Sequence, residues 1–433
     1  MYTYRMTEQE QKIDELLSRG VAEVIDREHL KARLIKGDVL RVKLGIDPTS
    51  PNIHLGRSIP LLKLRDFQEL GHQVMFIVGD FTGQIGDTSD KESERPMLSE
   101  DLVKKNMETY LSQAFKVLNK SKTTVSFNSS WLNSLDLKKI GELATWFSLS
   151  EFIARDNVKK RLDDGKRVSL REVLYPLMQG YDSVMVDADI EIGGTDQRFN
   201  MLAGRVIQKY YVPSSEERQS VEDRINGNIR NRWGTPEGGS IEFHDGPQDI
   251  IMTNLILGTD GRKMSSSWGN TINLLDIPNE MFGKIMSVPD ELIGSYFIHC
   301  TRVPMTDVAT IENDMKSGSN PRDAKLRLAK EIVTLYHSAE DAEKAEQYFI
   351  DTFSKKQIPE NISEVSVGDG EKLLDIIVRA GFAESKGDAR RKLEQGGVEI
   401  DGERITDMNS VVESTHDGKV LKVGKKDFVK IVF

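Results

Sequence analysis

Two short segments of the chain carry residue types suited to binding a polyphosphate. Pro51–Arg57 reads P-N-I-H-L-G-R, and Gly258–Asn270 contains K-M-S-S-S. His54 begins a predicted helix after a proline-rich turn, where backbone N–H groups and the helix dipole favour an anion. Either segment alone would equally fit an ordinary loop. Because they occur together and bracket a region with strand-loop-helix patterning, they predict chemistry on ATP.

A third segment places polar side chains on one face of a predicted helix. Tyr175, Gln179 and Asp182 are spaced at i, i+4 and i+7, and G-G-T-D-Q follows at 193–197. This spacing brings the three side chains to the same face. Polar groups on an otherwise apolar helix require buried partners or a ligand. A structural hydrogen-bond cluster would explain the three residues alone, but the neighbouring motifs favour a ligand.

These motifs resemble those of one enzyme family. H-L-G-R is similar to the HIGH motif of class I aminoacyl-tRNA synthetases, and K-M-S-S-S is similar to their KMSKS loop, in the same order. Y-P-L-M-Q-G-Y-D followed by G-G-T-D-Q resembles the signature of the tyrosyl branch of that family. The resemblance spans nearly the whole chain. It implies activation of L-tyrosine with ATP to tyrosyl-adenylate and transfer of tyrosine to the 3′ end of tRNA(Tyr).

The resemblance also implies which residues act on ATP. His54, Arg57 and Lys263 are expected to be catalytic, because nucleotidyl transfer depends on neutralising the negative charge that develops on the phosphates. Mg²⁺ is expected to accompany ATP, and no protein-bound metal site is expected. The expected ATP-binding residues are Gly45, Asp47, Thr49, His54, Gly56, Gly194, Asp196, Lys263 and Ser266.

A second set of residues is implied for the amino acid. Tyr175, Gln179 and Asp87 are expected to hold the substrate ammonium group. Asp182 is expected to accept a hydrogen bond from the phenol hydroxyl, and Gln197 is expected to lie nearby. Acceptor oxygens around an ammonium group and a carboxylate facing a hydroxyl are chemically suitable pairings.

The chain departs from the family pattern at three positions. Arg57 stands where a second histidine is usual, and Ser266 stands where a second lysine is usual. Arg57 keeps a donor and adds a fixed charge, so it is a candidate to compensate for the missing lysine; the alternative is a surface arginine. Lys43 stands where many bacterial tyrosyl enzymes have a tyrosine. The segment Arg198–Asn200 after G-G-T-D-Q is similar to the other bacterial tyrosyl subgroup.

Two groups of basic residues are candidates for phosphate contacts. Lys91 and Arg95 follow a glycine-rich loop at 79–88 and, by the resemblance, help to bind pyrophosphate. An ordinary solvated face is the alternative reading of both groups, since charge runs are usually exposed. The second group, near the expected active site and suited to an acceptor stem, is Lys159, Lys160, Arg161, Lys166, Arg167 and Arg171.

The elements that must position these residues alternate between strand and helix. Helices are expected at 7–36, 61–70, 99–118 and 135–164, and strands at Val39–Ile46, Val74–Val78, Ser183–Ile192 and Ile250–Leu257. Such alternation predicts a parallel sheet with crossover helices. The expected ligand-binding loops all follow strands, as in open parallel sheets that bind ligands at the carboxyl ends of their strands.

The fold class is therefore α/β, with a Rossmann-like parallel-sheet catalytic domain at 1–274 that carries a polar insertion at about 213–247. A helical domain is expected at 275–353, a linker at 354–370 and a small α+β RNA-binding domain at 371–433. The last contains A-R-R-K-L-E-Q-G-G-V-E-I-D-G-E-R, which resembles the α-L module of ribosomal proteins and pseudouridine synthases. A second basic strip is expected at Lys419–Lys430; a small domain without RNA contacts is the alternative. The expected RNA-binding residues are Lys386, Arg390, Arg391 and Lys392.

Composition narrows the class of protein and its compartment. The formal net charge of −10 argues against a globally basic nucleic-acid binder. The single cysteine, Cys300, cannot form an internal disulfide or a cysteine-pair metal site. With no apolar signal core or membrane span, a cytoplasmic protein is expected, and the resemblance implies a homodimer. The rival hypotheses are a tryptophanyl enzyme and an RNA-binding paralogue without catalysis.

Overall fold

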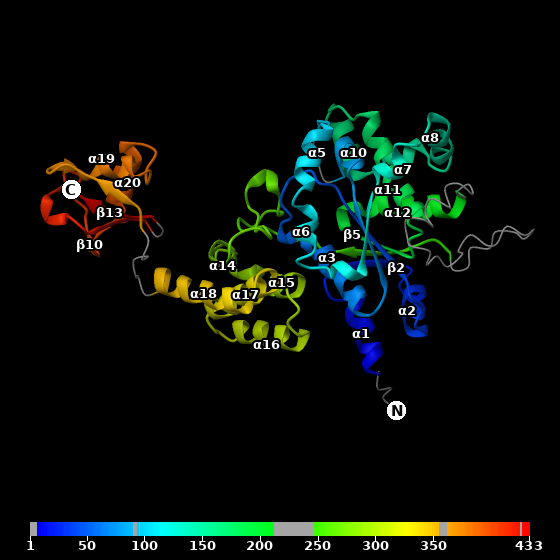
Figure 1. Cartoon of the computed structure of the whole chain (residues 1–433), viewed down its shortest axis with the longest axis horizontal. Coiled ribbons are helices and arrows are strands. Elements are labelled where there is room, and N and C mark those ends of the chain that lie inside the picture. Colours follow the sequence, from blue (N-terminus) through cyan, green and yellow to red (C-terminus); the bar gives the residue numbers. More distant parts are fainter. Residues whose placement is uncertain (1–6, 90–92, 95, 212–245, 355–361, 425–426) are drawn as a thin grey trace, which may run out of the picture. The chain divides into compact units, whose positions relative to one another are not determined.

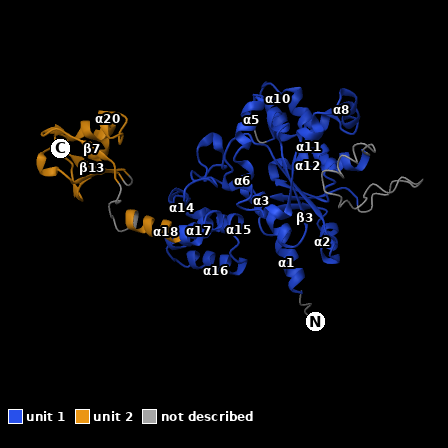
Figure 2. Cartoon of the chain, in the orientation of Figure 1, with its two compact units in different colours: residues 1–342 blue, residues 343–433 orange. Residues whose placement is uncertain are grey.

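The structure is a computed structural model that describes residues 7–89, 93–94, 96–211, 246–354, 362–424 and 427–433. The chain divides into two compact units, residues 1–342 and 343–433 (Figure 2). The first unit holds a mixed α/β region followed by helices, and the second holds a small β-rich module (Figure 1). The expected polar insertion at 213–247 lies almost entirely outside the described residues.

A six-stranded sheet forms the centre of the first unit, in the order β1-β6-β5-β2-β3-β4. β2 to β6 are all parallel, whereas β1 runs antiparallel to β6 at one edge. This confirms the predicted parallel sheet. The strand order switches direction between β2 and β5, where open α/β sheets bind ligands. The strands are β1 (Val21–Ile25), β2 (Arg41–Ile46), β3 (Gln73–Val78), β4 (Thr123–Phe127), β5 (Ile190–Gly194) and β6 (Asp249–Thr253).

Helices cover the sheet because its central strands are apolar on both sides. Met75 and Ile77 of β3 pack beneath α11 and α12, together with Tyr181 and Ile207, while α3 contacts β2, β3 and β5. Alternate residues of a strand point to opposite faces, so β3 needs cover on both. The helices are α1 (Glu8–Leu16), α2 (Arg27–Lys36), α3 (Leu55–Glu69), α4 (Thr82–Ile85), α5 (Glu100–Met107), α6 (Tyr110–Ala114), α7 (Ser129–Leu132), α8 (Leu137–Ala144), α9 (Leu149–Ile153), α10 (Asp156–Asp163), α11 (Leu170–Met185) and α12 (Arg198–Tyr210).

Two predicted elements of this unit are wrong. The helix expected at 7–36 is interrupted by β1, whose residues Val21, Val24 and Ile25 pair with β6. The strand expected at Ser183–Ile192 begins only at Ile190, because α11 continues to Met185. Asp187 has a φ of 48° in the turn between them. Short apolar runs do not distinguish the end of a buried helix from the start of a buried strand.

Five helices follow the sheet region: α14 (Pro278–Met286), α15 (Ile293–Cys300), α16 (Met305–Lys316), α17 (Pro321–Tyr336) and α18 (Ala339–Phe349). α14 and α17 each have a proline in the first turn, where the missing N–H has no intrahelical acceptor and costs nothing. These elements match the helical periodicity seen in the sequence.

The second unit contains a five-stranded sheet in the order β10-β9-β12-β13-β7, and a two-stranded ladder of β8 and β11. β7 pairs in parallel with β13, within the range 354–370 where a linker was expected. That expectation is therefore wrong for 364–366, since only Val365 of this three-residue strand is buried and it leaves little sequence signal. The elements are β7 (Glu364–Ser366), β8 (Glu371–Lys372), α19 (Leu373–Arg379), α20 (Lys386–Glu394), β9 (Val398–Ile400), β10 (Glu403–Arg404), β11 (Val411–Val412), β12 (Val420–Val423) and β13 (Asp427–Val432).

Candidate active site

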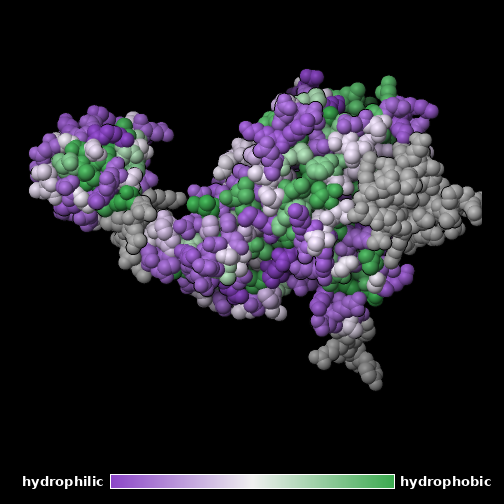
Figure 3. Space-filling model, in the orientation of Figure 1, coloured by the Kyte–Doolittle hydropathy of each residue, from purple (hydrophilic) through white to green (hydrophobic). Residues whose placement is uncertain are grey.

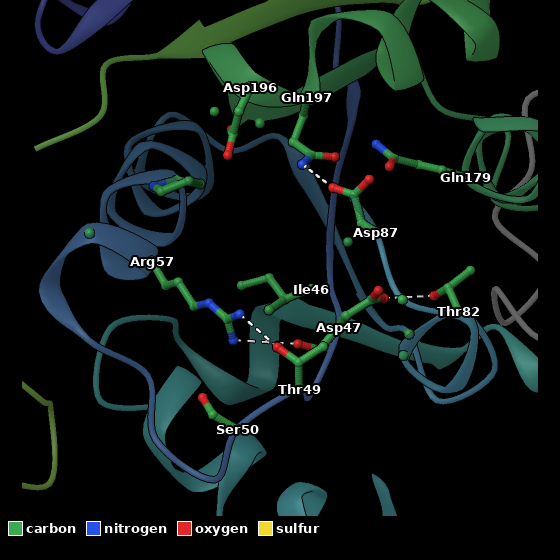
Figure 4. A pocket seen from close by; sticks show the side chains of 18 of the residues that line it. Ile46, Asp47, Thr49, Ser50, Arg57, Thr82, Asp87, Gln179, Asp196 and Gln197 are labelled. Atoms are coloured by element: carbon green, nitrogen blue, oxygen red, sulfur yellow. Dashed lines mark hydrogen bonds between the residues drawn. The ribbon is translucent and has the colours of Figure 1, made fainter. Parts of the chain in front are cut away.

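A cavity of about 570 Å³ lies at the carboxyl ends of β2, β3 and β5, where the strand order switches. Figure 4 shows polar side chains from several elements pointing into it. The structure brings together in this cavity every residue predicted for catalysis, amino-acid binding and ATP binding. These are Gly45, Asp47, Thr49, His54, Gly56, Arg57, Asp87, Tyr175, Gln179, Asp182, Gly194, Asp196, Gln197, Lys263 and Ser266.

Asp182 lies buried on α11 at one end of the cavity. Its two carboxylate oxygens accept hydrogen bonds from Trp131 Nε1 at 2.7 Å and Asn128 Nδ2 at 3.2 Å. Burial raises the pKa of Asp182 to about 7, although both of these bonds act in the opposite direction. Sequence reasoning missed Asn128 and Trp131 because they follow β4 without any recognisable motif. The arrangement gives the cavity a fixed acceptor for a hydroxyl group.

Asp47 joins the first strand of the site to the α11 residues. Its carboxylate accepts a hydrogen bond from Thr82 Oγ1 at 2.7 Å (Figure 4). It accepts another from Tyr175 Oη, also at 2.7 Å. Withdrawal from bulk water raises the pKa of Asp47 to about 6. A Cβ at Gly79 would lie 2.0 Å from Asp47 Oδ1, so a glycine is required there. Asp47 therefore fixes the Tyr175 hydroxyl as it enters the cavity.

Asp87 and Gln197 form a second polar pair in the cavity. Gln197 Nε2 donates to Asp87 Oδ2 at 2.7 Å (Figure 4). Asn200 Nδ2 donates to Gln197 Oε1 at 3.0 Å. Asp87 Oδ1 accepts from the backbone and hydroxyl of Ser89. These bonds fix the orientation of the Asp87 side chain, on the same side of the cavity as Gln179 (Figure 4).

His54 and Arg57 occupy the start of α3. Burial, with the charges of Arg57 and Lys263, lowers the pKa of His54 to about 3, so its imidazole is neutral. The buried His54 Nδ1 has no hydrogen-bond partner among the described residues. Arg57 lines the cavity and donates to Tyr110 Oη at 2.6 Å and Thr49 Oγ1 at 2.9 Å. The alternative of an ordinary surface arginine is therefore wrong.

The K-M-S-S-S loop closes the opposite side of the cavity. Lys263 Nζ lies 3.2 Å from Asp196 Oδ2. Asn270 organises the loop, because its side chain accepts from the Ser265 backbone N–H at 2.9 Å and donates to Asp260 at 2.7 Å. Arg57, Lys263 and the first turn of α3 thus give this end of the cavity donors and positive charge suited to phosphates.

Two groups of basic residues were predicted to contact phosphates in addition to the motifs that line the cavity. Lys91 and Arg95 lie outside the described residues. Arg161 is buried and donates to Glu172 Oε2 at 2.5 Å, so its place in an exposed basic patch is wrong. Arg171 is also paired, with Glu94 at 3.5 Å. A basic residue within a charge run can be a buried structural partner, which sequence alone does not reveal.

The RNA-binding residues predicted in the second unit lie on α20. Lys386, Arg390 and Arg391 are exposed and Lys392 is half-buried. Three of the four have carboxylate partners within the same unit: Lys386 pairs with Asp375, and Arg391 and Lys392 with Asp388. Of the second strip, Lys422 and Lys430 are paired with Glu399 and Glu364.

In the described parts of the chain, no group of three or more histidine, cysteine, aspartate or glutamate residues could hold a metal ion. None of the helices in those parts has both the length and the apolar character needed to cross a membrane.

The cavity combines two chemically different ends in one space. One end carries Asp182, Asp87 and a hydroxyl fixed by Asp47, which suits an ammonium and a hydroxyl group. The other carries neutral His54 with Arg57 and Lys263, which suits a polyphosphate. Together with the parallel sheet and the position at its switch point, these features define an α/β nucleotide-binding synthetase that activates a carboxylate.

Comparison with known proteins agrees with this class. Residues 36–354 match the family model for class I tRNA synthetases (W and Y), and residues 354–431 match the tyrosine–tRNA ligase SYY-like C-terminal domain. A tyrosine–tRNA ligase of Dehalococcoides mccartyi is 43% identical over 99% of this chain and 100% of that protein. One from Thermotoga maritima is 41% identical over 98% of each. The chain belongs to the tyrosine–tRNA ligase family of class I synthetases.

Solved structures of lower sequence identity share the fold. A C-terminally truncated mitochondrial tyrosyl-tRNA synthetase of Aspergillus nidulans aligns with a TM-score of 0.61 at 21% identity, covering 79% of this chain and 94% of that one. The tyrosyl-tRNA synthetase of Archaeoglobus fulgidus, complexed with L-tyrosine, aligns with a TM-score of 0.55 at 22% identity, covering 78% and 99%.

Proposed function

We propose that this chain activates L-tyrosine with ATP, forming tyrosyl-adenylate and pyrophosphate, and then transfers tyrosine to the 3′ end of tRNA(Tyr). The observation that carries the proposal is that Asp182 lines the same cavity as His54, Arg57 and Lys263. A cavity of this kind accommodates the amino acid and the nucleotide together. The reaction then needs no protein nucleophile, because the tyrosine carboxylate attacks the α-phosphorus.

Recognition of tyrosine uses the acidic end of the cavity. Asp182, held by Trp131 and Asn128, accepts the phenol hydroxyl. The ammonium group binds to Asp87, Gln179 and the oxygen of Tyr175. Because the Tyr175 hydroxyl donates its proton to Asp47, its oxygen lone pairs are left to accept from the ammonium.

Activation of ATP uses the opposite end. Gly194 and Asp196 bind the ribose, and a side chain at Gly194 would lie 2.5 Å from Asp196 Oδ1. Neutral His54 donates a hydrogen bond to the phosphates, whereas Arg57 and Lys263 supply positive charge as the bond to pyrophosphate breaks. Arg57 takes the place of the lysine that is missing at Ser266. Mg²⁺ enters with ATP as part of the substrate.

Binding of tRNA involves the C-terminal module. In the domain organisation that we propose, this module follows the catalytic region at 1–274 and the helices at 275–353. The exposed Lys386, Arg390 and Arg391 on α20 offer donors to phosphate oxygens. The carboxylate partners of Lys386 and Arg391 within the module, Asp375 and Asp388, are exchanged for phosphates on binding. Such contacts add affinity and orientation but do not read the base sequence.

The enzyme acts as a cytoplasmic homodimer. Large apolar side chains are exposed along the helices from α8 to the start of α11, and Figure 3 shows hydrophobic residues scattered among hydrophilic ones over this part of the molecule. An apolar surface of this kind fits an interface between copies of the chain. The residues concerned are Leu137, Trp146, Leu149, Ile153, Leu162 and Leu170.

Amino-acid-dependent exchange of pyrophosphate into ATP tests the proposal. We expect exchange with tyrosine and none with tryptophan or phenylalanine at equal concentrations. Exchange with tryptophan would establish the tryptophanyl activity instead, and no exchange with any amino acid would indicate an RNA-binding protein without catalysis. Gel filtration with light scattering tests the dimer, which Leu149→Asp should dissociate because a charge on an apolar interface is poorly tolerated.

A further inference from the structure

A buried charged cluster lies behind the amino-acid end of the cavity. Lys43 of β2 and Glu191 of β5 are register partners in the parallel sheet, so their side chains point to the same face. Both are buried, and Lys43 Nζ lies 2.9 Å from Glu191 Oε1. Glu191 lines the cavity but Lys43 is not among its lining residues. The pair therefore connects the interior of the sheet to the wall of the site.

The hydrogen-bonding groups of Lys43, Glu191 and the Ser183 hydroxyl are all used, whereas Gln248 Oε1 has no partner among the described residues. Lys43 Nζ also donates to Ser183 Oγ at 2.7 Å and to the main-chain oxygen of Gln179 at 3.0 Å. Glu191 Oε2 accepts from Gln248 Nε2 at 2.5 Å and from Ser183 Oγ at 3.2 Å. A buried ion pair is costly to desolvate, and it is tolerated when geometry and further hydrogen bonds compensate. Because every polar atom of the two charged side chains is bonded, the ion pair itself is held rigidly.

α12 approaches this cluster so closely that only glycine fits there. A Cβ at Gly204 would lie 2.6 Å from Gln248 Nε2, 2.9 Å from Ser183 Oγ and 3.3 Å from Glu191 Oε2. Gly204 leaves room for the charged groups. Apolar side chains filling the same space would avoid the free-energy cost of desolvating two charges. A buried ion pair contributes less to stability than apolar packing of the same volume would. Stability therefore does not explain why Lys43 and Glu191 are here, and a role in the neighbouring site does.

The cluster acts on the site through the Gln179 side chain. Gln179 Nε2 donates to Glu191 Oε1 at 3.1 Å, the same oxygen that accepts from Lys43. A carboxylate can only accept hydrogen bonds, so it must meet the amino end of the amide. The carbonyl oxygen of Gln179 is then the end of the amide left for a ligand. In Figure 4 the amide of Gln179 points into the part of the cavity where Asp87 and Gln197 lie.

We propose that the Lys43–Glu191 pair is a positioning element for amino-acid recognition, which fixes the Gln179 amide with its carbonyl oxygen toward the substrate ammonium group. Lys43 holds Glu191 in place and anchors the main-chain carbonyl of the same glutamine, so both ends of Gln179 are tied to one cation. The inference rests on the proposed function, in which Gln179 contacts the ammonium. It assigns Lys43 a role behind the site, in place of a direct contact with the phenol.

The test is the double variant Lys43→Met/Glu191→Gln, which removes both charges together and keeps the net charge of the site unchanged. An amide at 191 can donate as well as accept, so it no longer dictates which end of Gln179 faces the ligand. Calorimetric titration measures the affinity for tyrosine and for 3-(4-hydroxyphenyl)propionate, which lacks the ammonium group. We expect the ratio of these affinities to fall about tenfold, which is the loss of one charge-assisted hydrogen bond.

The preference for tyrosine over phenylalanine should change by less than about threefold in the same variant. The Lys43 charge acts to lower the pKa of Asp182 and the Glu191 charge acts more weakly to raise it, so removing both disturbs the phenol end less than removing Lys43 alone. A merely structural role would weaken both discriminations together. That outcome, or an unchanged ammonium ratio, would overturn the inference. If the double variant does not fold, Glu191→Gln alone is measured in the same way.

Two further variants separate the possible failures. Arg41→Met/Asp187→Asn removes another buried pair based on β2, one that does not line the cavity, and should leave the ammonium ratio unchanged. An equal fall in this control would overturn the inference. Gln179→Ala should lower the ratio as the double variant does. No effect of Gln179→Ala would instead reject the ammonium contact in the proposed function, and with it the positioning role.

Discussion

Lys263→Ala should slow adenylate formation while leaving tyrosine affinity nearly intact. The ammonium group of Lys263 lies 3.2 Å from Asp196 in a pair whose side chains are 33% and 21% exposed. A pair this accessible to water contributes less than about 1 kcal/mol to the folded enzyme. Its charge becomes valuable when negative charge moves onto the departing pyrophosphate, and losing such a contact costs about 3 kcal/mol, or roughly two orders of magnitude in rate.

The assay is pre-steady-state formation of tyrosyl-adenylate, with tyrosine and ATP titrated separately. Arg262→Ala is the matched control, because Arg262 lies next in the same loop, pairs with Asp260 and stacks on Trp268 with its guanidinium 4.9 Å from the ring centre. We expect the control to stay within about threefold of the unmodified enzyme. A raised tyrosine dissociation constant with an unchanged rate in Lys263→Ala, or equal loss in both variants, would refute the assigned role.

Three more predictions follow from the site and the C-terminal module. Because the pKa of Asp182 is raised to about 7 by burial, its acid form dominates below that pH, and the KM for tyrosine should rise as pH falls below about 7. Asp182→Asn should flatten this pH dependence and erode discrimination against phenylalanine. Gly56→Ala would place a methyl 3.1 Å from the His54 ring, so adenylate formation should fall about tenfold with little loss of stability, whereas Gly283→Ala, whose methyl meets nothing within 4 Å, should retain activity. A fragment of residues 1–354 should retain pyrophosphate exchange but lose tRNA charging; normal charging by that fragment would exclude an RNA-binding role for the module.

Parts of this fold that repeat a strong local pattern were predictable from the sequence. The all-apolar run Val74–Val78 became a buried strand, and the glycine-containing segments after the strands became the loops of the cavity. The errors fall where the pattern is short or where a partner far away in the chain decides the structure. Val21–Ile25 fits either a helix face or an edge strand, and pairing with β6 selects the strand. β7 is too short to leave a signal and exists because the end of the chain pairs with it.

The candidate site shows the same limit at the level of side chains. Motifs indicated which residues line the cavity, because they lie on three or four segments with recognisable spacing. They did not indicate what holds those residues, since Asn128 and Trp131 at the start of α7 and Glu191 of β5 belong to no motif. Lys43 illustrates the consequence: by position it suggested a lost phenol contact, but its partners are Glu191, Ser183 and the Gln179 main chain. Comparison with the family pattern shows only which direct contact is missing at a substituted position. The partners of the new residue in the structure show which neighbouring group it holds instead.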